Sequence, residues 1–208
     1  MSEIMKRPAF FLDTTACSGC KACQVACKDK NDLAPGLTYR RVYEIEGGNW
    51  KSSDGVITEK PFGYFLSISC NNCEDAPCTG ACPTTALHRT DDGFIIIDPL
   101  RCMGCNYCEW TCPYGALKMD SSRGIMTKCD FCIDYLYEGR NPACVDACPM
   151  RALEFGYYED FMLRKGAVSS VYPLPGPEMT KPGLVIKPHK DTAKANNSSA
   201  VVNNLENY

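Results

Sequence analysis

Short apolar runs recur along the sequence between polar and glycine-rich segments. Two of these runs, Ala9–Leu12 and Phe94–Ile97, are four residues each, a length typical of short buried strands. An Asp-Gly pair stands directly before the second run, and turns of this kind join antiparallel strands. We therefore predict a β-hairpin over residues 86–98.

A second hairpin is predicted over residues 36–62. Residues 39–46 alternate in part between apolar and polar side chains, which favours a half-buried strand. Two turn signals follow this strand, at Gly47-Gly48 and at Asp54-Gly55. We expect this segment to be a β-hairpin insertion, because it interrupts the pattern that the neighbouring segments share.

The last quarter of the chain contains three segments of different composition. Tyr158, Phe161 and Met162 have helical spacing, and we expect a short helix over residues 157–165 whose apolar stripe belongs to the core. Five prolines then fall between Pro173 and Pro188, a composition that cannot continue a helix or a central strand. We predict an extended arm that lies along a partner, followed by a polar, Asn-rich tail over residues 189–208.

Composition places the chain among folded proteins. It has 208 residues, of which 45% are hydrophobic and 23% charged, enough for one domain or two small ones. No apolar run approaches the roughly 18 residues that span a bilayer. A formal net charge of -3 gives no case for nucleic acid. The first residues fit neither a secretory nor a twin-arginine signal, so we expect no export signal and no disulfide-rich secreted fold.

Sixteen cysteines dominate the chemistry, and they fall into four groups of four. Groups one and three have the spacing C-x2-C-x2-C-x3-C, which binds a [4Fe-4S] cluster in bacterial ferredoxins. Groups two and four keep the leading C-x2-C and the closing C-x3-C but lengthen the middle. The groups are Cys17, Cys20, Cys23, Cys27; Cys70, Cys73, Cys78, Cys82; Cys102, Cys105, Cys108, Cys112; and Cys129, Cys132, Cys144, Cys148.

The spacing favours clusters over two other uses of cysteine. Three cysteines within seven positions wrap one cubane, while the fourth points away and ligates the partner cluster in two-cluster ferredoxins. Zinc ribbons pair two C-x2-C knuckles and have no use for a third cysteine. Eight disulfides are improbable in a chain without an export signal. A proline follows the fourth cysteine at Pro83, Pro113 and Pro149, whereas Lys28 follows Cys27, so group one departs from the pattern.

Internal repeats indicate a duplicated ferredoxin. The segment from Asp13 to Cys20 matches the segment from Asp98 to Cys105 at a constant offset of 85. The segment from Pro77 to Leu87 recurs, with one inserted residue, from Pro142 to Leu153. The predicted hairpin between groups two and three is the connection of a bacterial ferredoxin, which leaves groups one and four to pair across the chain. The residues alone leave open the pairing of one with two and three with four.

Crossed ligation within these pairs predicts four sets of ligands, here named quartets A to D. Quartet A is Cys17, Cys20, Cys23 and Cys148; quartet B is Cys129, Cys132, Cys144 and Cys27; quartet C is Cys70, Cys73, Cys78 and Cys112; quartet D is Cys102, Cys105, Cys108 and Cys82. The predicted fold is α+β, with an outer ferredoxin-like module over residues 1–35 and 121–156 and an inner one over 63–120. The hairpin insertion at 36–62 and the helix and arm at 157–208 complete it.

Few other residues suggest chemistry. Lys21, Lys28, Arg101 and Lys128 flank cysteine groups, where they either compensate cluster charge or lie in solvent. Tyr107 and Trp110 either shield a cluster or, as we expect, pack in the core. His88 and His189 lie outside the ligand runs, and we expect neither to bind metal. The chain has no phosphate-binding glycine loop and no Ser, His and acid constellation, so we expect an electron wire and no catalytic residues.

The order of the four groups resembles the four-cluster iron-sulfur subunits of complex molybdopterin oxidoreductases. Strings outside the cysteine frame, above all YRRVYEIEGGNW and TKPGLVIKP, resemble the iron-sulfur subunit of anaerobic dimethyl sulfoxide reductase over about residues 9–189. Some relatives have Trp at the position of Cys105 and bind [3Fe-4S] there, so the resemblance implies four [4Fe-4S] clusters here. It also implies the pairing of group one with four and two with three.

The resemblance further implies two partners. One is a molybdopterin catalytic subunit that reduces dimethyl sulfoxide, and the other is a membrane anchor subunit that oxidises quinol. The implied location is the periplasmic face of the inner membrane, reached by export with the catalytic partner. Two alternatives stay open: the same wire for a tetrathionate, polysulfide or selenate reductase or a formate dehydrogenase, and a free ferredoxin-type carrier.

Overall fold

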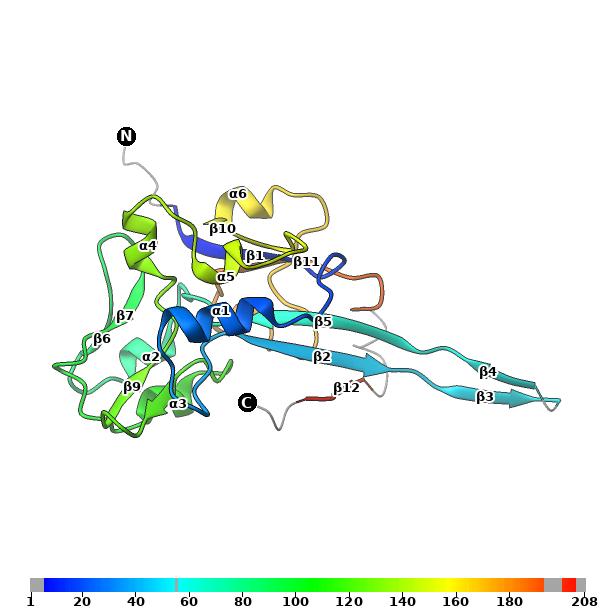
Figure 1. Cartoon of the computed structure of the whole chain (residues 1–208), viewed down its shortest axis with the longest axis horizontal. Coiled ribbons are helices and arrows are strands. Elements are labelled where there is room, and N and C mark those ends of the chain that lie inside the picture. The colour runs from blue at the N-terminus through cyan, green and yellow to red at the C-terminus, as the bar shows by residue number, and fades with distance from the viewer. Residues whose placement is uncertain (1–5, 55, 193–199, 205–208) are drawn as a thin grey trace.

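The chain folds into a body of short helices and small sheets, from which one long two-stranded ribbon projects (Figure 1). The computed structural model describes residues 6–54, 56–192 and 200–204. The chain contains both short helices and small, mostly antiparallel sheets, in line with the predicted α+β content, although the two kinds of element are interspersed along the sequence. The described residues contain no helix long and apolar enough to cross a membrane.

The central sheet ties the N-terminus to two late segments of the chain. Strand β1 (Pro8–Asp13) lies between β10 (Leu153–Tyr157), which is antiparallel to it, and β11 (Leu184–Lys187), which is parallel to it. Phe10 and Leu12 pack in the main core, while Ala9 and Phe11 pack on the opposite face of the sheet. The apolar run is continuous because both faces of this strand are buried.

Strand β11 corrects the prediction of an extended arm. Leu184, Val185 and Ile186 are at most 2% exposed, so this part of the arm lies inside the protein's own core. Pro182 and Pro188 bound the strand without interrupting it, and β11 lies at the edge of its sheet, where flanking prolines are tolerated. The prolines correctly indicated extended backbone, but the predicted contact with a partner is wrong for this segment.

The remainder of the C-terminal region also folds back on the body. A short 3-10 helix, η1 (Pro177–Met179), precedes the fully buried Thr180. Strand β12 (Val201–Val202) pairs antiparallel with β2 (Arg41–Gly47), and the Asn204 amide donates to the Val42 carbonyl oxygen at 2.9 Å. The rest of the predicted polar tail, residues 193–199 and 205–208, lies outside the described residues.

The ribbon is longer than the hairpin predicted from the sequence. Strand β2 pairs with β5 (Phe62–Ile68), and the ribbon continues outward as β3 (Trp50–Ser53) and β4 (Val56–Glu59). Gly47-Gly48 is therefore no turn. A side chain at Gly48 would meet the Lys60 carbonyl oxygen at 2.6 Å, so glycine is needed where the two strands approach closely. The return strand β5 extends past residue 62, where the insertion was expected to end.

The predicted elements between and after the cysteine groups form with shifted ends. Strands β6 (Leu87–Arg89) and β7 (Ile95–Ile97) make the hairpin predicted over residues 86–98. Helix α6 (Tyr158–Met162) buries Phe161 as predicted but ends three residues early. A hairpin of β8 (Lys118–Asp120) and β9 (Ile125–Thr127) was not predicted; Asp120 accepts hydrogen bonds from the Ser122 N–H and hydroxyl and so forms its turn.

The helices that carry cysteines pack in two pairs. Helix α1 (Ala22–Lys30) lies against α5 (Ala143–Asp146), and α2 (Pro77–Gly80) lies against α3 (Tyr107–Thr111). A further short helix, α4 (Ile133–Tyr137), contains no cysteine but begins directly after Cys132. Cysteines of the first and fourth groups thus meet across one helix pair, and those of the second and third groups meet across the other.

Candidate metal centres

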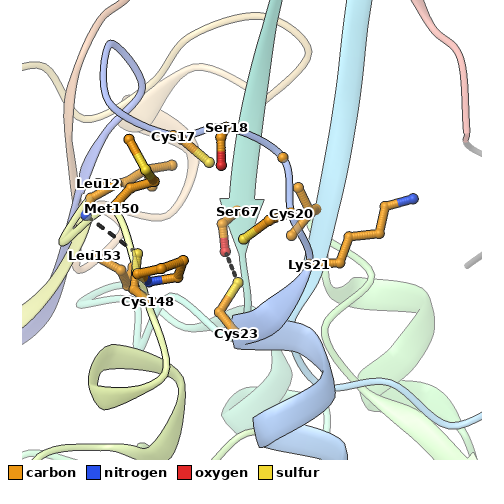
Figure 2. Close-up of a pocket in the computed structure, with 14 residues that line it drawn as sticks. Leu12, Cys17, Ser18, Cys20, Lys21, Cys23, Ser67, Cys148, Met150 and Leu153 are labelled. Carbon is orange, nitrogen blue, oxygen red and sulfur yellow. Dashed lines mark hydrogen bonds between the residues drawn. The ribbon is translucent and has the colours of Figure 1, made fainter.

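Quartet A surrounds a hollow near the surface. Figure 2 shows Cys17 and Cys20 on the loop that leads into α1 and Cys23 in its first turn, facing Cys148 from the segment after α5. The hollow is about 350 Å³ in volume, and apolar side chains such as Leu12 and Leu153 complete its wall. Four thiols from two distant parts of the sequence therefore face one space.

The other three quartets come together in the same way. Cys27 lies beside Cys144 and Cys132, and Cys129 lies beside Cys27. Cys73 and Cys78 each lie beside Cys70 and Cys112. The four thiols of quartet D line a hollow of about 310 Å³ together with Leu87, Ile97 and Met126. The structure thus gathers the thiols of quartets A and D around one hollow each and brings members of quartets B and C near one another.

The cysteines are available as ligands. All sixteen lie in the described residues, and none forms a disulfide. The thiols of quartets A and D each line one hollow. Four thiols around one space are the donor set that a [4Fe-4S] cluster takes, with each thiolate on a different iron.

A left-handed residue shapes every C-x2-C loop. The residue just before the second cysteine has a positive φ in all four groups: 70° at Gly19, 44° at Asn72, 69° at Gly104 and 67° at Phe131. This backbone reversal turns the two flanking sulfurs toward the same side. At Gly104 a side chain is excluded for a second reason, because its Cβ would lie 2.4 Å from the Gly124 carbonyl oxygen in the β8–β9 turn.

Replacing Gly104 by alanine is expected to destabilise the fold more than replacing Gly139. Both glycines are left-handed, with φ of 69° and 74°, so both variants carry the strain of about 1–2 kcal/mol that this conformation imposes. Nothing lies within 4 Å of a Cβ at Gly139, whereas Gly104→Ala adds a backbone clash. Anaerobic guanidinium unfolding should show the larger loss for Gly104→Ala. Equal losses would contradict the close approach.

The fourth cysteine of three groups receives a backbone hydrogen bond. The third residue after it is left-handed, at Thr85, Gly115 and Arg151, and this turn directs a following N–H back at the sulfur. The donor-to-sulfur distances are 3.5 Å from Leu87 to Cys82, 3.5 Å from Ala116 to Cys112 and 3.3 Å from Ala152 to Cys148. Hydrogen bonds to sulfur are among the features that set the potential of an iron-sulfur cluster.

Group one achieves the same contact differently. Lys28 replaces the usual proline, so α1 continues through Cys27 to Lys30. The turn after Cys27 therefore comes only at the end of the helix, and the Asn31 side-chain amide donates to the Cys27 sulfur at 3.7 Å. The departure of group one from the Cys-Pro pattern is thus a consequence of its longer helix.

Burial makes the thiolate forms costly without a bound cation. It raises the pKa of Cys27, Cys73 and Cys78 to about 12 and that of Cys108 to about 11, and it raises the pKa of Cys129 well above its ordinary value. Iron ligation requires thiolates, so the positive charge of bound iron has to offset this desolvation.

Of the basic residues that flank the groups, only Lys128 lies deep inside. It is 6% exposed, and its ammonium donates to the carbonyl oxygens of Ile95 and Cys129. Burial would lower the pKa of Lys128, but the facing thiolates of Cys70, Cys129 and Cys78 raise it.

The other three basic residues have partners away from the sulfurs. Lys21 pairs with Glu44 at 2.8 Å near the surface. Lys28 bonds to the carbonyl oxygens of Ala34 and Leu37, and Arg101 bonds to that of Thr84.

Sequence reasoning missed Arg40 and misplaced two aromatic residues. Arg40 is 1% exposed and faces thiols of quartets A and B, yet an arginine beside a half-alternating strand gives no signal of burial. Tyr107 and Trp110 pack on each other, with ring centroids 5.6 Å apart, but they do so at the surface, where they are 52% and 76% exposed. Of the two histidines, His88 contacts the Ala86 carbonyl oxygen and His189 contacts Asp191.

Comparison with known proteins first gives the class. Residues 61–158 match the model of the 4Fe-4S dicluster domain, which includes groups two, three and four. The protein is therefore an iron-sulfur protein with a ferredoxin-type domain.

Relatives of nearly the same length then give the family. The sequence is 45% identical over 197 residues to YnfG of Escherichia coli, a probable anaerobic dimethyl sulfoxide reductase subunit, covering 95% of this protein and 96% of the relative. It is 43% identical over 201 residues to the B subunit of anaerobic dimethyl sulfoxide reductase of Haemophilus influenzae, covering 96% and 98%. The thiosulfate reductase electron transfer subunit PhsB of Salmonella typhi is 36% identical over 166 residues, covering 79% and 83%. The protein belongs to the family of anaerobic dimethyl sulfoxide reductase iron-sulfur subunits.

Proposed function

We propose that the protein binds four [4Fe-4S] clusters, one in each quartet, and passes electrons along them between two partner proteins. Quartets A and B form an outer ferredoxin-like module, and quartets C and D form an inner one. The clusters supply one-electron redox chemistry, and the protein's own residues hold them, shield them from water and set their order. No residue of the chain has a catalytic role in this proposal.

The observation that carries the proposal is the spatial order of the quartets, in which a cysteine or a helix of each quartet lies near one of the next. Cys23 of quartet A lies beside Cys144 of quartet B. Cys70 of quartet C lies beside Cys129 of quartet B. Helices α2 and α3 bring quartet C against quartet D. The order A, B, C, D is a continuous path from one side of the body to the other.

The two ends of this path are proposed as docking faces. At the quartet D end, Leu100, Met103 and Trp110 are 95%, 65% and 76% exposed, and exposed apolar clusters mark interaction surfaces. At the quartet A end, Cys20 is exposed and Met150 is half exposed beside it. An electron enters at one of these ends and leaves at the other.

The partners are proposed from the family. A membrane anchor subunit that oxidises quinol gives electrons to the protein, and a molybdopterin catalytic subunit takes them to reduce dimethyl sulfoxide or a related S- or N-oxide. The near-complete length match to dimethyl sulfoxide reductase subunits supports this choice. The proposed location is the periplasmic face of the inner membrane, reached together with the catalytic partner.

Two alternative functions use the same wire. The similarity to a thiosulfate reductase subunit favours another terminal enzyme, whose catalytic partner would choose the substrate. A free carrier is disfavoured by the projecting ribbon, whose exposed Val56 and Ile57 suit a fixed partner better than a diffusing protein (Figure 1). Identifying the proteins that co-purify with the chain, and the oxide that reoxidises the complex, separates these functions.

The anaerobically purified protein is expected to contain about sixteen irons and as many acid-labile sulfides per chain, since each quartet holds a cluster of four irons. Metal analysis and sulfide assay on the same sample measure both numbers. Stoichiometric zinc, or iron without sulfide, would contradict the proposal. About eight irons would mean that only two clusters are bound, which would contradict the proposed four.

A further inference from the structure

Arg40 is a buried cation with an unusual set of neighbours. It precedes β2 and is 1% exposed. Its guanidinium stacks over the Phe10 ring at 4.4 Å and donates to the hydroxyls of Ser67 and Ser69 on and beside β5, at 3.2 and 3.0 Å. These contacts fix the charge in one position. Arginine stays protonated in proteins, so the charge is permanent.

The fixed charge lies between quartets A and B. The Ser67 hydroxyl that Arg40 contacts is 3.4 Å from the Cys23 sulfur of quartet A, as Figure 2 shows for the serine and the thiol. On the quartet B side, the Arg40 side chain lies close enough to Cys144 to interact with it, and the Arg40 backbone N–H faces Cys27.

Among the described residues, no carboxylate forms an ion pair that would balance this charge. Within the same part of the chain, the Nε atom of Arg40 has no hydrogen-bond partner. Removing a charge from water without a partner costs several kcal/mol. The negative charge has to come from the two quartets and what they hold, since an oxidised cluster with four thiolates carries about -2.

We propose that Arg40 is an electrostatic positioning residue shared by the clusters of quartets A and B, and that it raises the reduction potential of both. Reduction adds one electron, and hence one negative charge, to a cluster; no bond forms or breaks. A fixed cation beside the cluster favours this more negative state. Because one cation faces two clusters, it also screens their mutual repulsion. The inference rests on the proposed function, since it requires clusters in quartets A and B.

Arg40→Gln and Arg40→Lys test the role of the charge. Both are made in the complex with its co-purifying partners and examined by a redox titration followed by electron paramagnetic resonance. We expect Arg40→Gln to lower the reduced-to-oxidised ratio of both clusters at least tenfold at a fixed potential, which corresponds to 59 mV for a one-electron couple. The clusters of quartets C and D should not shift, and Arg40→Lys should restore most of the change.

The matched control is Lys21→Gln, which removes the same charge next to Cys20. Lys21 lies near the surface and pairs with Glu44, so solvent and that carboxylate screen it. We expect a shift well below that of Arg40→Gln. A shift no larger in Arg40→Gln than in Lys21→Gln, or one of equal size in all four clusters, would overturn the inference.

Iron and sulfide content separates failure of the inference from failure of the proposed function. A wild-type protein without clusters in quartets A and B would defeat the proposed function itself. If Arg40→Gln loses those clusters, its potentials cannot be measured, and the Arg40→Lys variant then tests the inference. Retention of iron and potentials by the lysine variant would support the role of charge, whereas loss of iron in it would show that the shape of the guanidinium matters and overturn the inference.

Discussion

Replacing Cys148 by serine is expected to remove the cluster that Cys17, Cys20 and Cys23 hold, although Cys148 lies in a distant part of the sequence. The reason is the crossed arrangement of quartet A, in which Cys148 faces the loop of group one (Figure 2). Iron content should fall by up to a quarter, or one cluster should convert to a three-iron form. Electron transfer through the protein should fall by orders of magnitude, because the loss breaks the path at one end. Paramagnetic resonance of the reduced protein identifies the missing signal.

Cys132→Ser is the matched control. Cys132 belongs to group four, as Cys148 does, but it stands in quartet B beside Cys144. The two variants should therefore lose different signals, and Cys17→Ser should lose the same signal as Cys148→Ser. If Cys148→Ser and Cys132→Ser removed the same signal, the crossing between groups one and four would be wrong.

Truncating the Ile186 side chain to alanine is expected to cost about 2–5 kcal/mol of the free energy of unfolding, the usual range for a fully buried isoleucine. Ile186 is 0% exposed and lies in β11, opposite Leu12 of β1. The neighbouring Lys187→Ala removes only a surface ion pair with Asp13 and should cost no more than about 1 kcal/mol. Anaerobic guanidinium unfolding followed by circular dichroism measures both.

The same pair of variants decides between two roles for the C-terminal segment. If Ile186→Ala left stability unchanged and only weakened the complex with the catalytic partner, the segment would be the docking arm that its prolines suggested. A loss of stability with intact binding of the partner by the folded fraction would establish β11 as part of the core.

Local signals explain which parts of the fold could be predicted. The cysteine spacings, the Asp-Gly turn before β7 and the helical spacing around Phe161 each act within a few residues, and each predicted the correct element. Strand β11 could not be found this way, because its partner β1 lies at the other end of the chain and no local pattern records that pairing. Prolines at 182 and 188 describe the backbone of the segment but not its neighbours.

The candidate site, too, could be predicted where the signals are local and not where contacts come from distant parts of the chain. Repeats and the ferredoxin hairpin favoured the four quartets but left another pairing of the groups open, and only the family resemblance implied the one that was chosen. The burial of Arg40 depends on Phe10 in β1, on Ser67 in β5 and on Ser69, which directly follows β5. These residues are distant from Arg40 in the sequence, so no local pattern reveals the burial. Gly47-Gly48 gave a false turn because a glycine pair suits both a turn and a close approach of two strands, and only the partner at Lys60 distinguishes them.

The position of β1 between β10 and β11 has a consequence for biosynthesis. A nascent polypeptide emerges N-terminus first, so the thiols of group one leave the ribosome long before Cys148 and before either strand that pairs with β1. The second and third groups, which follow each other closely, can complete their cluster sites earlier. If each quartet holds a cluster, iron loading should proceed from the second and third groups outward, and the last cluster to be inserted should link the first group of cysteines to the fourth.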